Sequence, residues 1–302
     1  MEKDEVIIGI DVGGTKIAAG IVNNKGEIIQ QERIPTDLSE EDAVLYQLEK
    51  IVKLLLEQKS DSLTVSGIGI GLPGKVDYKN GIAEAASNIP YKSLPIGPEL
   101  SSKFKIPVYL ENDADAATLG EKWFGAGKGH DRFIYFTVGT GIGAGIIAGG
   151  DLVRGCEIGH TIVDPEGPIC KCGTRGCFEA VAAGPAIARK MNEDVEGQSF
   201  STEEVITAAE NGNKKGQAII EETAHFLALG LINVSQILMP EIIILGGGVI
   251  MGSRETLLDP IKDKIDNLTN YNTYLSSSLI ISQLKQSGVI GTAAICLQKK
   301  KN

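Results

Sequence analysis

Residues 6–22 read VIIGIDVGGTKIAAGIV, two apolar runs separated by a glycine turn at Gly13-Gly14. Such runs, bounded by glycine, are typical of two strands joined by a tight turn. A second segment, residues 133–148, reads FIYFTVGTGIGAGIIA and repeats this arrangement around Gly139-Thr140-Gly141. The repetition indicates a duplicated unit built on two strand–glycine–strand turns.

Strand-like and helix-like segments alternate along the rest of the chain. After Ser39, a candidate N-cap, apolar residues recur at helical spacing between Leu45 and Leu55. Strands that alternate with helices predict mixed α/β sheets flanked by helices. Further strands are expected at residues 27–34, 65–70, 108–111 and 242–245. Further helices are expected at residues 99–104, 186–192, 202–210, 216–238 and 289–297.

The composition is that of a folded, acidic protein. Hydrophobic residues make up 42% and charged residues 23% of the 302 residues, and the formal net charge is -10. This excess of acid disfavours nucleic acid as a partner, because a phosphate backbone binds basic surfaces. The longest apolar runs are far shorter than the roughly 20 residues of a membrane span. The charged segment Met1–Glu5 lacks the apolar core of a signal peptide, so a cytoplasmic protein without a membrane partner is expected.

Both glycine turns have the chemistry of a phosphate cradle. In the first, Gly13 and Gly14 offer unhindered N–H groups, Thr15 a hydroxyl, Lys16 an ammonium, and Asp11 a carboxylate for Mg²⁺ held through water. The second turn repeats the cradle without a basic side chain. A tight hairpin explains either turn alone equally well. The presence of both turns, together with three glycines at residues 246–248 after a third strand, favours phosphate binding over plain hairpins.

A candidate base, Asp113, stands where the strand at residues 108–111 gives way to a helix. The orphan N–H groups and the dipole of a helix stabilise an ionised carboxylate at its N-terminus, by up to about 1 kcal/mol. Such a carboxylate can accept a hydroxyl proton late in a loose phosphoryl transfer. By itself, however, the position favours a plain helix N-cap. Asp115, two residues later, is expected to be a solvated acid of the first turn.

Three of the five cysteines fall within eight residues. Cys170, Cys172 and Cys177 supply soft ligands, and His160 upstream could complete a tetrahedral set suited to zinc. The spacing is not the common CxxC, so free thiols remain the alternative. The other two cysteines do not fit this site.

Five motifs together resemble those of the ROK family of sugar kinases and repressors, within the actin-like ATPase superfamily. They are DVGGTK at Asp11–Lys16, GLPG at Gly71–Gly74, ENDAD at Glu111–Asp115, EIGH at Glu157–His160 and CKCGTRGCFE at Cys170–Glu179. The last two motifs in succession are the most specific. The resemblance runs over essentially the whole chain.

The resemblance implies an α/β fold of two actin-like (ribonuclease H-like) lobes, with ATP and a sugar in the cleft between them. The smaller lobe is expected to hold residues 1–117 with a C-terminal helix at residues 288–302. The larger lobe is expected to hold residues 118–287 and the zinc motif. The implied cofactors are Mg-ATP and a structural zinc ion, and the implied assembly is a homodimer.

The resemblance also implies roles for single residues. Asp113 is expected to be the catalytic base. The positions expected to bind the sugar are Gly74, Asn112, Asp113, Glu157, His160 and Glu179. The positions expected to contact ATP are Thr15, Thr140, Gly141, Gly247 and Gly248, beside Asp11, Gly13, Gly14 and Lys16 of the first turn. The expected zinc ligands are His160, Cys170, Cys172 and Cys177.

The implied activity is ATP-dependent phosphorylation of a hexose, with glucose at O6 as the expected substrate. Two departures from the family pattern bear on the hexose: Tyr91 stands where Trp is common, and the segment Gly150–Cys156 is shorter than in family glucokinases. Kinases for N-acetylmannosamine, fructose, allose or β-glucosides remain alternatives. A repressor is disfavoured, because strand-like sequence begins at Val6 without a preceding helix-turn-helix domain. A non-catalytic sugar sensor is disfavoured, because Asp113 and the phosphate turns are present.

Overall fold

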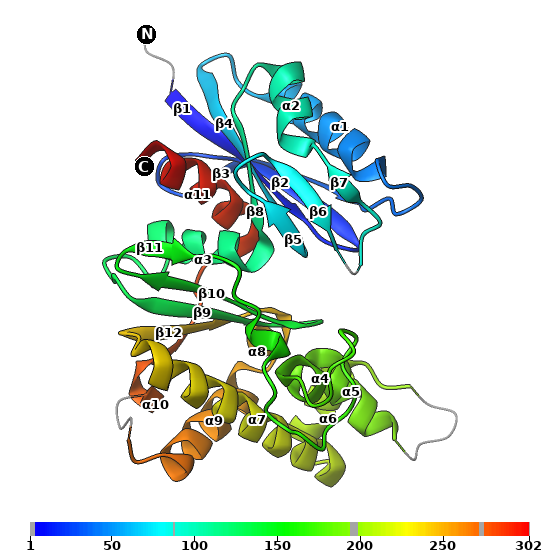
Figure 1. The fold of residues 1–302 in the computed structure, drawn as a ribbon, viewed down its shortest axis with the longest axis vertical. Helices are drawn as coiled ribbons and strands as arrows, with labels where there is room; N and C mark the ends of the chain where they lie inside the picture. The colour runs from blue at the N-terminus through cyan, green and yellow to red at the C-terminus, as the bar shows by residue number, and fades with distance from the viewer. Residues whose placement is uncertain (1–3, 87, 194–198, 272–274, 302) are drawn as a thin grey trace. The chain divides into compact units, whose positions relative to one another are not determined.

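The computed structural model describes residues 4–86, 88–193, 199–271 and 275–301 (Figure 1). The chain folds as two compact units. Unit 1 comprises residues 1–128 and 283–302, and unit 2 comprises residues 129–282. Unit 1 therefore extends beyond residue 117, the boundary expected from the sequence, and includes the whole helix that begins at Asp113 and ends at Phe124.

Unit 1 is built on a five-stranded mixed sheet. Its strands are β1 (Asp4–Val12), β2 (Lys16–Val22), β3 (Ile28–Pro35), β4 (Leu63–Leu72) and β8 (Val108–Asn112). In the order β3-β2-β1-β4-β8, the first three strands pair antiparallel, and β4 and β8 continue parallel to β1. In the central strand β1, the run from Val6 to Ile10 has no polar side chain and is buried, because both faces of the strand are covered.

Helices cover both faces of this sheet. They are α1 (Ala43–Gln58) on one face and α11 (Ser287–Lys301), with α3 (Asp113–Phe124), on the other, drawn in blue, red and green in Figure 1. Successive side chains of a strand point to opposite faces. Ile8 therefore joins the core cluster of Leu48 in α1, whereas Ile7 joins that of Val289 in α11.

The C-terminal helix α11 lies directly on the sheet because glycine lines the contact. A Cβ built on Gly69 in β4 would lie only 1.8 Å from the carbonyl oxygen of Thr292 in α11. Any side chain at Gly69 would therefore push the helix off the sheet. The C-terminal segment is thus an integral part of unit 1.

Unit 1 is completed by a small sheet and one helix that the sequence pattern only partly indicates. They are β5 (Lys75–Asp77), β6 (Ile82–Ala85), β7 (Lys92–Leu94) and α2 (Ile96–Phe104). Strands this short are too brief to show a period of alternation. The expected N-cap Ser39 is wrong: α1 begins at Ala43 after Asp42, and the Ser39 N–H instead donates to Asp37 Oδ1, 2.9 Å away, in a preceding turn.

Unit 2 repeats the sheet of unit 1. Its strands are β9 (Phe133–Val138), β10 (Ile142–Ala148), β11 (Asp151–Val153), β12 (Ile242–Gly246) and β13 (Leu279–Ile281). They follow the order β11-β10-β9-β12-β13, with the same antiparallel and parallel pairs as in unit 1. The duplication predicted from the two glycine turns is confirmed.

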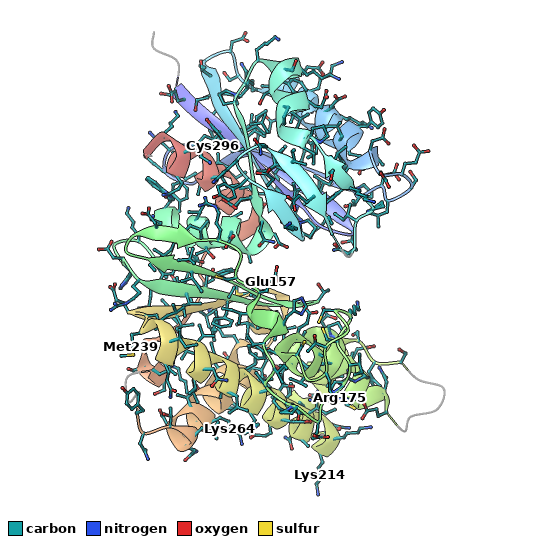
Figure 2. All side chains as sticks on the ribbon, viewed as in Figure 1. Glu157, Arg175, Lys214, Met239, Lys264 and Cys296 are labelled. Atoms are coloured by element: carbon teal, nitrogen blue, oxygen red, sulfur yellow. The ribbon has the colours of Figure 1, made fainter. Side chains whose placement is uncertain are left out.

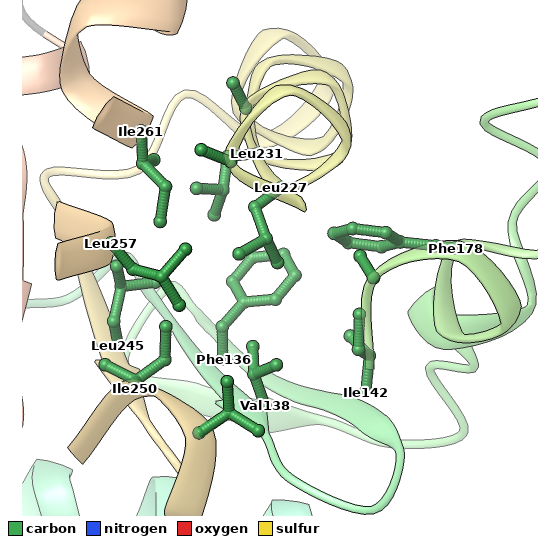
Figure 3. Close-up of a cluster of buried hydrophobic side chains, with 14 of the residues drawn as sticks. Phe136, Val138, Ile142, Phe178, Leu227, Leu231, Leu245, Ile250, Leu257 and Ile261 are labelled. Atoms are coloured by element: carbon green, nitrogen blue, oxygen red, sulfur yellow. The ribbon is translucent and has the colours of Figure 1, made fainter. Parts of the chain in front are cut away.

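The helices of unit 2 pack on one face of its sheet. They are α4 (Phe178–Ala182), α5 (Gly184–Asn192), α6 (Thr202–Glu210), α7 (Lys214–Leu238), α8 (Gly248–Gly252), α9 (Arg254–Leu268) and α10 (Leu275–Ser278), with a 3-10 turn η1 (Ile158–His160). Figure 3 shows Phe136 of β9 among Leu227 of α7, Leu257 of α9 and Phe178 of α4. The two phenyl rings meet edge to face, with centroids 6.5 Å apart. This cluster fixes α4, which carries Glu179, against the strand that leads into the second glycine turn.

Helix α7 is long and apolar enough to cross a membrane by length and composition. Its apolar window is 61% buried within the protein, however. Ile220, Leu227 and Leu231 of α7 belong to the core cluster of unit 2. The apolar character of α7 is thus accounted for by its place as the core helix of this unit.

Candidate active site

The first glycine turn, between β1 and β2, is tightly hydrogen-bonded. The Gly13 N–H donates to the carbonyl of Lys16 over 2.9 Å, and the Thr36 hydroxyl donates to the carbonyl of Gly13 over 2.6 Å. The Thr36 N–H donates to the carbonyl of Thr15 over 3.1 Å. These hydrogen bonds from Thr36, directly after β3, hold the turn in a defined conformation in which Thr15 is exposed.

Two carboxylates, Asp11 and Asp113, influence each other at the ends of β1 and β8. Burial and, to a smaller extent, the like charge of Asp113 raise the pKa of Asp11 to about 6, against the opposing charge of Lys16. The parallel strands β1 and β8 lie on either side of β4. Their carboxyl-terminal ends therefore place Asp11 and Asp113 at the same end of the unit 1 sheet. Paired carboxylates of this kind suit the binding of a divalent cation or the transfer of a proton.

Asn112, rather than Asp113, is the N-cap of α3. Its Oδ1 accepts hydrogen bonds from the N–H groups of Ala114, at 3.0 Å, and Asp115, at 3.4 Å. Asp113 is the first helical residue, and its Oδ1 accepts from the Ala114 N–H at 2.8 Å. The plain N-cap interpretation of Asp113 is therefore wrong, since Asn112 occupies the N-cap position.

The Asn112 side chain also ties the GLPG loop to this corner. Its Nδ2 donates to the carbonyl of Gly74 over 3.1 Å, which brings the expected sugar-binding residues Gly74, Asn112 and Asp113 together. Tyr91 lies beside them, because its hydroxyl donates to the carbonyl of Pro73. Burial raises the pKa of Tyr91, and the nearby Asp113 charge raises it further. Tyr91, which stands where Trp is common in the family, therefore supports the GLPG loop through this hydrogen bond.

Asp115 is not the solvated acid that the sequence suggests. The residue is only 5% exposed. The reason is that α3 is buried on all sides over this stretch, since every residue from Ala114 to Glu121 is buried.

The raised pKa of Asp11 predicts a pH-dependent gain in stability when the charge is removed. The native state holds a proton on Asp11 up to about pH 6, whereas the unfolded chain releases it near 3.8. Between these values the native state binds more protons, so its stability falls as the pH rises. Asp11→Asn is therefore expected to raise the free energy of unfolding at pH 7 by roughly 1–3 kcal/mol, with no gain at pH 3.5. Urea unfolding of both proteins without Mg²⁺ at several pH values measures this, and a gain that does not change with pH would contradict it.

In unit 2, Glu179 lies against the second glycine turn. Its Oε2 accepts a hydrogen bond from the Ile142 N–H over 3.2 Å, and a Cβ built on Gly141 would lie 2.3 Å from the same oxygen. Glycine at 141 is therefore required for this approach. The structure thus joins one expected sugar-binding acid, Glu179, to one expected phosphate residue, Gly141.

The second glycine turn also borders a cavity of about 470 Å³ in unit 2. Thr140 and Gly248, both expected at the nucleotide, line it together. Gly247 precedes α8 with a φ of 88°, a conformation that favours glycine. A cavity of this size is ordinary for a small-molecule ligand.

Most of the cavity wall was missed by sequence reasoning. Helix α6 presents Thr202, Glu203, Ile206, Thr207 and Glu210, and α5 presents Gly184 and Pro185. The missed signals are a capping box that starts α6, in which Ser201 and Glu204 bind each other's N–H groups, and a proline in the first turn of α5. Both mark helices, but neither indicates that the helices face a ligand.

His160 and the three clustered cysteines converge in unit 2. Their ligand atoms all lie within 4.8 Å of one another. Cys172 Sγ lies 3.6 Å from Cys177 Sγ, and Cys170 Sγ lies 3.7 Å from His160 Nδ1. Burial raises the pKa of Cys177 to about 12, whereas a hydrogen bond from the Thr174 backbone lowers that of Cys172 to about 6.

This cluster has the dimensions of a tetrahedral metal site. Ligand atoms about 2.3 Å from a tetrahedral zinc ion lie roughly 3.8 Å apart, close to the two distances above. A tight turn presents the sulfurs: the Cys170 N–H donates to the carbonyl of Thr174 over 2.8 Å, and Gly173 adopts a φ of 90°. Three thiols and one imidazole are also the donor set that zinc prefers. The residues present therefore fit zinc.

Residues 7–299 match the model of the ROK family. The chain belongs to the ROK family. It is 34% identical to the glucokinase of Thermotoga maritima, over 97% of this chain and 98% of the relative.

Two solved ROK structures are similar throughout. The ROK hexokinase of Thermus thermophilus is 31% identical with a TM-score of 0.83, over 98% of this chain and all of that one. The ROK glucokinase of Streptomyces griseus, solved with glucose and AMPPNP, is 32% identical with a TM-score of 0.80, over 97% of this chain and 99% of that one. The predicted mixed α/β fold of actin-like type is confirmed.

Glu157 is the remaining candidate sugar-binding residue of this ROK protein. It comes directly before η1, where its side chain is exposed (Figure 2). Glu157 is connected to the cluster of His160 and the three cysteines through the backbone, since the His160 N–H donates to the carbonyl of Glu157 over 3.1 Å. Cys156 and Cys296 lie outside the cluster, as the sequence indicated.

Proposed function

We propose that this ROK protein is a cytoplasmic ATP-dependent glucokinase that transfers the γ-phosphoryl group of ATP to O6 of glucose. The observation that carries the proposal is the corner of unit 1 where Asp113, the first residue of α3, lies near Asp11. Its similarity over nearly the full length to a glucokinase and to a structure with glucose and an ATP analogue supports the same activity.

In this proposal, Asp113 is the catalytic base. Its carboxylate orients the 6-hydroxyl of glucose and takes up the proton as the oxygen attacks the γ-phosphorus. The new P–O bond forms as the bond to the β-phosphate oxygen breaks, which leaves ADP and glucose 6-phosphate. Asn112 and the backbone of Gly74 hold the sugar in place, and their own hydrogen bond fixes them relative to Asp113.

The phosphates are assigned to the two glycine turns. Gly13, Gly14, Thr15 and Lys16 contribute from unit 1, and Thr140 and Gly141 from unit 2. When bound, Mg²⁺ would neutralise charge on the phosphate oxygens, and Asp11 would hold it through water.

The adenosine is assigned to the cavity of unit 2. Gly247 and Gly248 lie at the start of α8, where N–H groups favour an anion next to the nucleoside. The neutral wall beside them, formed by Ile206 and Val249, suits a base.

Glu157, His160 and Glu179 are assigned to the sugar hydroxyls. Polar acceptors suit a polyol, because a site built to pair hydroxyls rejects analogues that leave it unpaired. His160 Nδ1 faces Cys170, so a zinc ion held by His160, Cys170, Cys172 and Cys177 would leave Nε2 free to reach a hydroxyl. The zinc would be structural, since all four of its positions are filled by protein.

The assembly and partners follow from the same assignment. We propose a homodimer whose partners are glucose and ATP, with no nucleic acid or membrane. Sedimentation velocity measures the oligomeric state directly.

The substrate assignment predicts that glucose gives the highest kcat/KM in a panel of hexoses. The panel comprises glucose, mannose, fructose, allose, N-acetylmannosamine, N-acetylglucosamine and a β-glucoside, with Mg-ATP as donor. The phosphorylated position is identified by NMR of the product. A higher kcat/KM for N-acetylmannosamine, or for another sugar in the panel, would overturn the glucose assignment and leave the phosphoryl transfer standing. If no sugar in the panel is phosphorylated, the assignment as a sugar kinase is overturned.

A further inference from the structure

Gly288, in the first turn of α11, lies against the side chain of Asp11. A Cβ built on Gly288 would lie 2.2 Å from Asp11 Oδ2 and 2.6 Å from its Cγ. The three heavy atoms nearest to that position all belong to Asp11. A methyl group at residue 288 and the present position of the Asp11 carboxylate therefore exclude each other.

The backbone places Gly288 at the start of α11. Gln286, with a φ of 56°, turns the chain into α11, and the Ile290 N–H donates to its carbonyl over 3.2 Å. Gly288 is therefore the second residue of the helix, where backbone N–H groups have no partner within the helix.

We propose that Gly288 is a positioning residue for phosphoryl transfer, because its missing side chain keeps open the space in which the Asp11 carboxylate lies against α11. The inference rests on the proposed function, in which Asp11 serves Mg-ATP. The C-terminal helix thereby sets the position of an acid at the end of β1. The five motifs that identify the family do not include Gly288.

The direct test is Gly288→Ala. A displacement of Asp11 by about 1 Å is expected to lower kcat/KM for Mg-ATP by about 100-fold. The melting temperature should not fall, because alanine is a better helix former than glycine and the collision involves only one side chain. Ser287→Ala, one residue away in the same helical turn, is the matched control and should keep wild-type kinetics. Wild-type kcat/KM in Gly288→Ala would overturn the proposal.

A double-mutant cycle shows whether Gly288 acts through Asp11. Asp11→Asn alone should lower kcat/KM for Mg-ATP, and adding Gly288→Ala to it should lower kcat/KM no further. Additive losses would overturn the proposal, because Gly288 would then act elsewhere. If Asp11→Asn alone keeps wild-type kcat/KM, the proposed role of Asp11 in binding Mg-ATP is contradicted. If Asp11→Asn loses activity and Gly288→Ala does not, the positioning role of Gly288 is contradicted and the proposed role of Asp11 remains.

Binding supplies a readout that does not depend on turnover. Calorimetry with ADP, with and without Mg²⁺, should show that Gly288→Ala loses the gain in affinity due to Mg²⁺, as Asp11→Asn does, while ADP alone binds as in the wild type. A retained Mg²⁺ gain would overturn the proposal. If Gly288→Ala folds poorly, Asp11→Gly combined with it removes the collision and should restore the melting temperature. Failure to restore it would equally overturn the proposal.

Discussion

Asp113→Asn is expected to lower kcat by at least about two to three orders of magnitude, the usual effect of removing a general base. Asparagine can still accept the hydrogen bond that Asp113 Oδ1 takes from the Ala114 N–H, so α3 keeps its first turn. It cannot take up the proton of the sugar hydroxyl. Glucose affinity should change much less, since the substitution leaves the proposed sugar contacts of Asn112 and Gly74 in place. Steady-state kinetics with glucose and Mg-ATP measure both quantities.

Glu99→Gln is the matched control for this change. Glu99 is an exposed acid in the first turn of α2, so the substitution removes a carboxylate from a comparable place in another helix of unit 1. It should leave kcat unchanged. A near wild-type kcat in Asp113→Asn, with the melting temperature also unchanged, would show that Asp113 is not the base.

Loss of the metal cluster is expected to lower stability and sugar binding together. Cys172→Ser removes one of four ligands, so the purified variant should contain no zinc, whereas the wild type should contain one ion per chain. Because a structural zinc site is coupled to folding, the melting temperature should fall by about 10 °C or more. KM for glucose should rise, since His160 loses its anchor, while ADP binding should change little, because Thr140 and Gly248 line a separate cavity.

Cys156→Ser is the control, because it removes a thiol outside the cluster. It should retain one zinc ion per chain and the wild-type melting temperature. Elemental analysis that finds no zinc in wild-type protein prepared without chelator would contradict the metal assignment. So would a Cys172→Ser variant as stable and active as the wild type.

Local sequence determined the features that depend on neighbours along the chain. The two glycine turns predicted both sheets and their duplication, because alternation and turn chemistry act over a few residues. The convergence of the candidate zinc ligands was predicted for the same reason, since all of them fall between His160 and Cys177. The strand-to-helix junction at Asp113 was also visible, together with its two interpretations.

The tertiary structure decided what depends on packing between distant segments. Only hydrogen-bond geometry showed that Asn112 caps α3, and only the packing around α3 showed that Asp115 is buried. The cavity beside Thr140 requires α5, α6 and α8 to meet, and the contact of Asp11 with Gly288 joins the two ends of the chain. Periodicity in the sequence shows which face of a segment is buried but not which segment covers it. Close packing makes that choice, through small residues that let particular backbones approach.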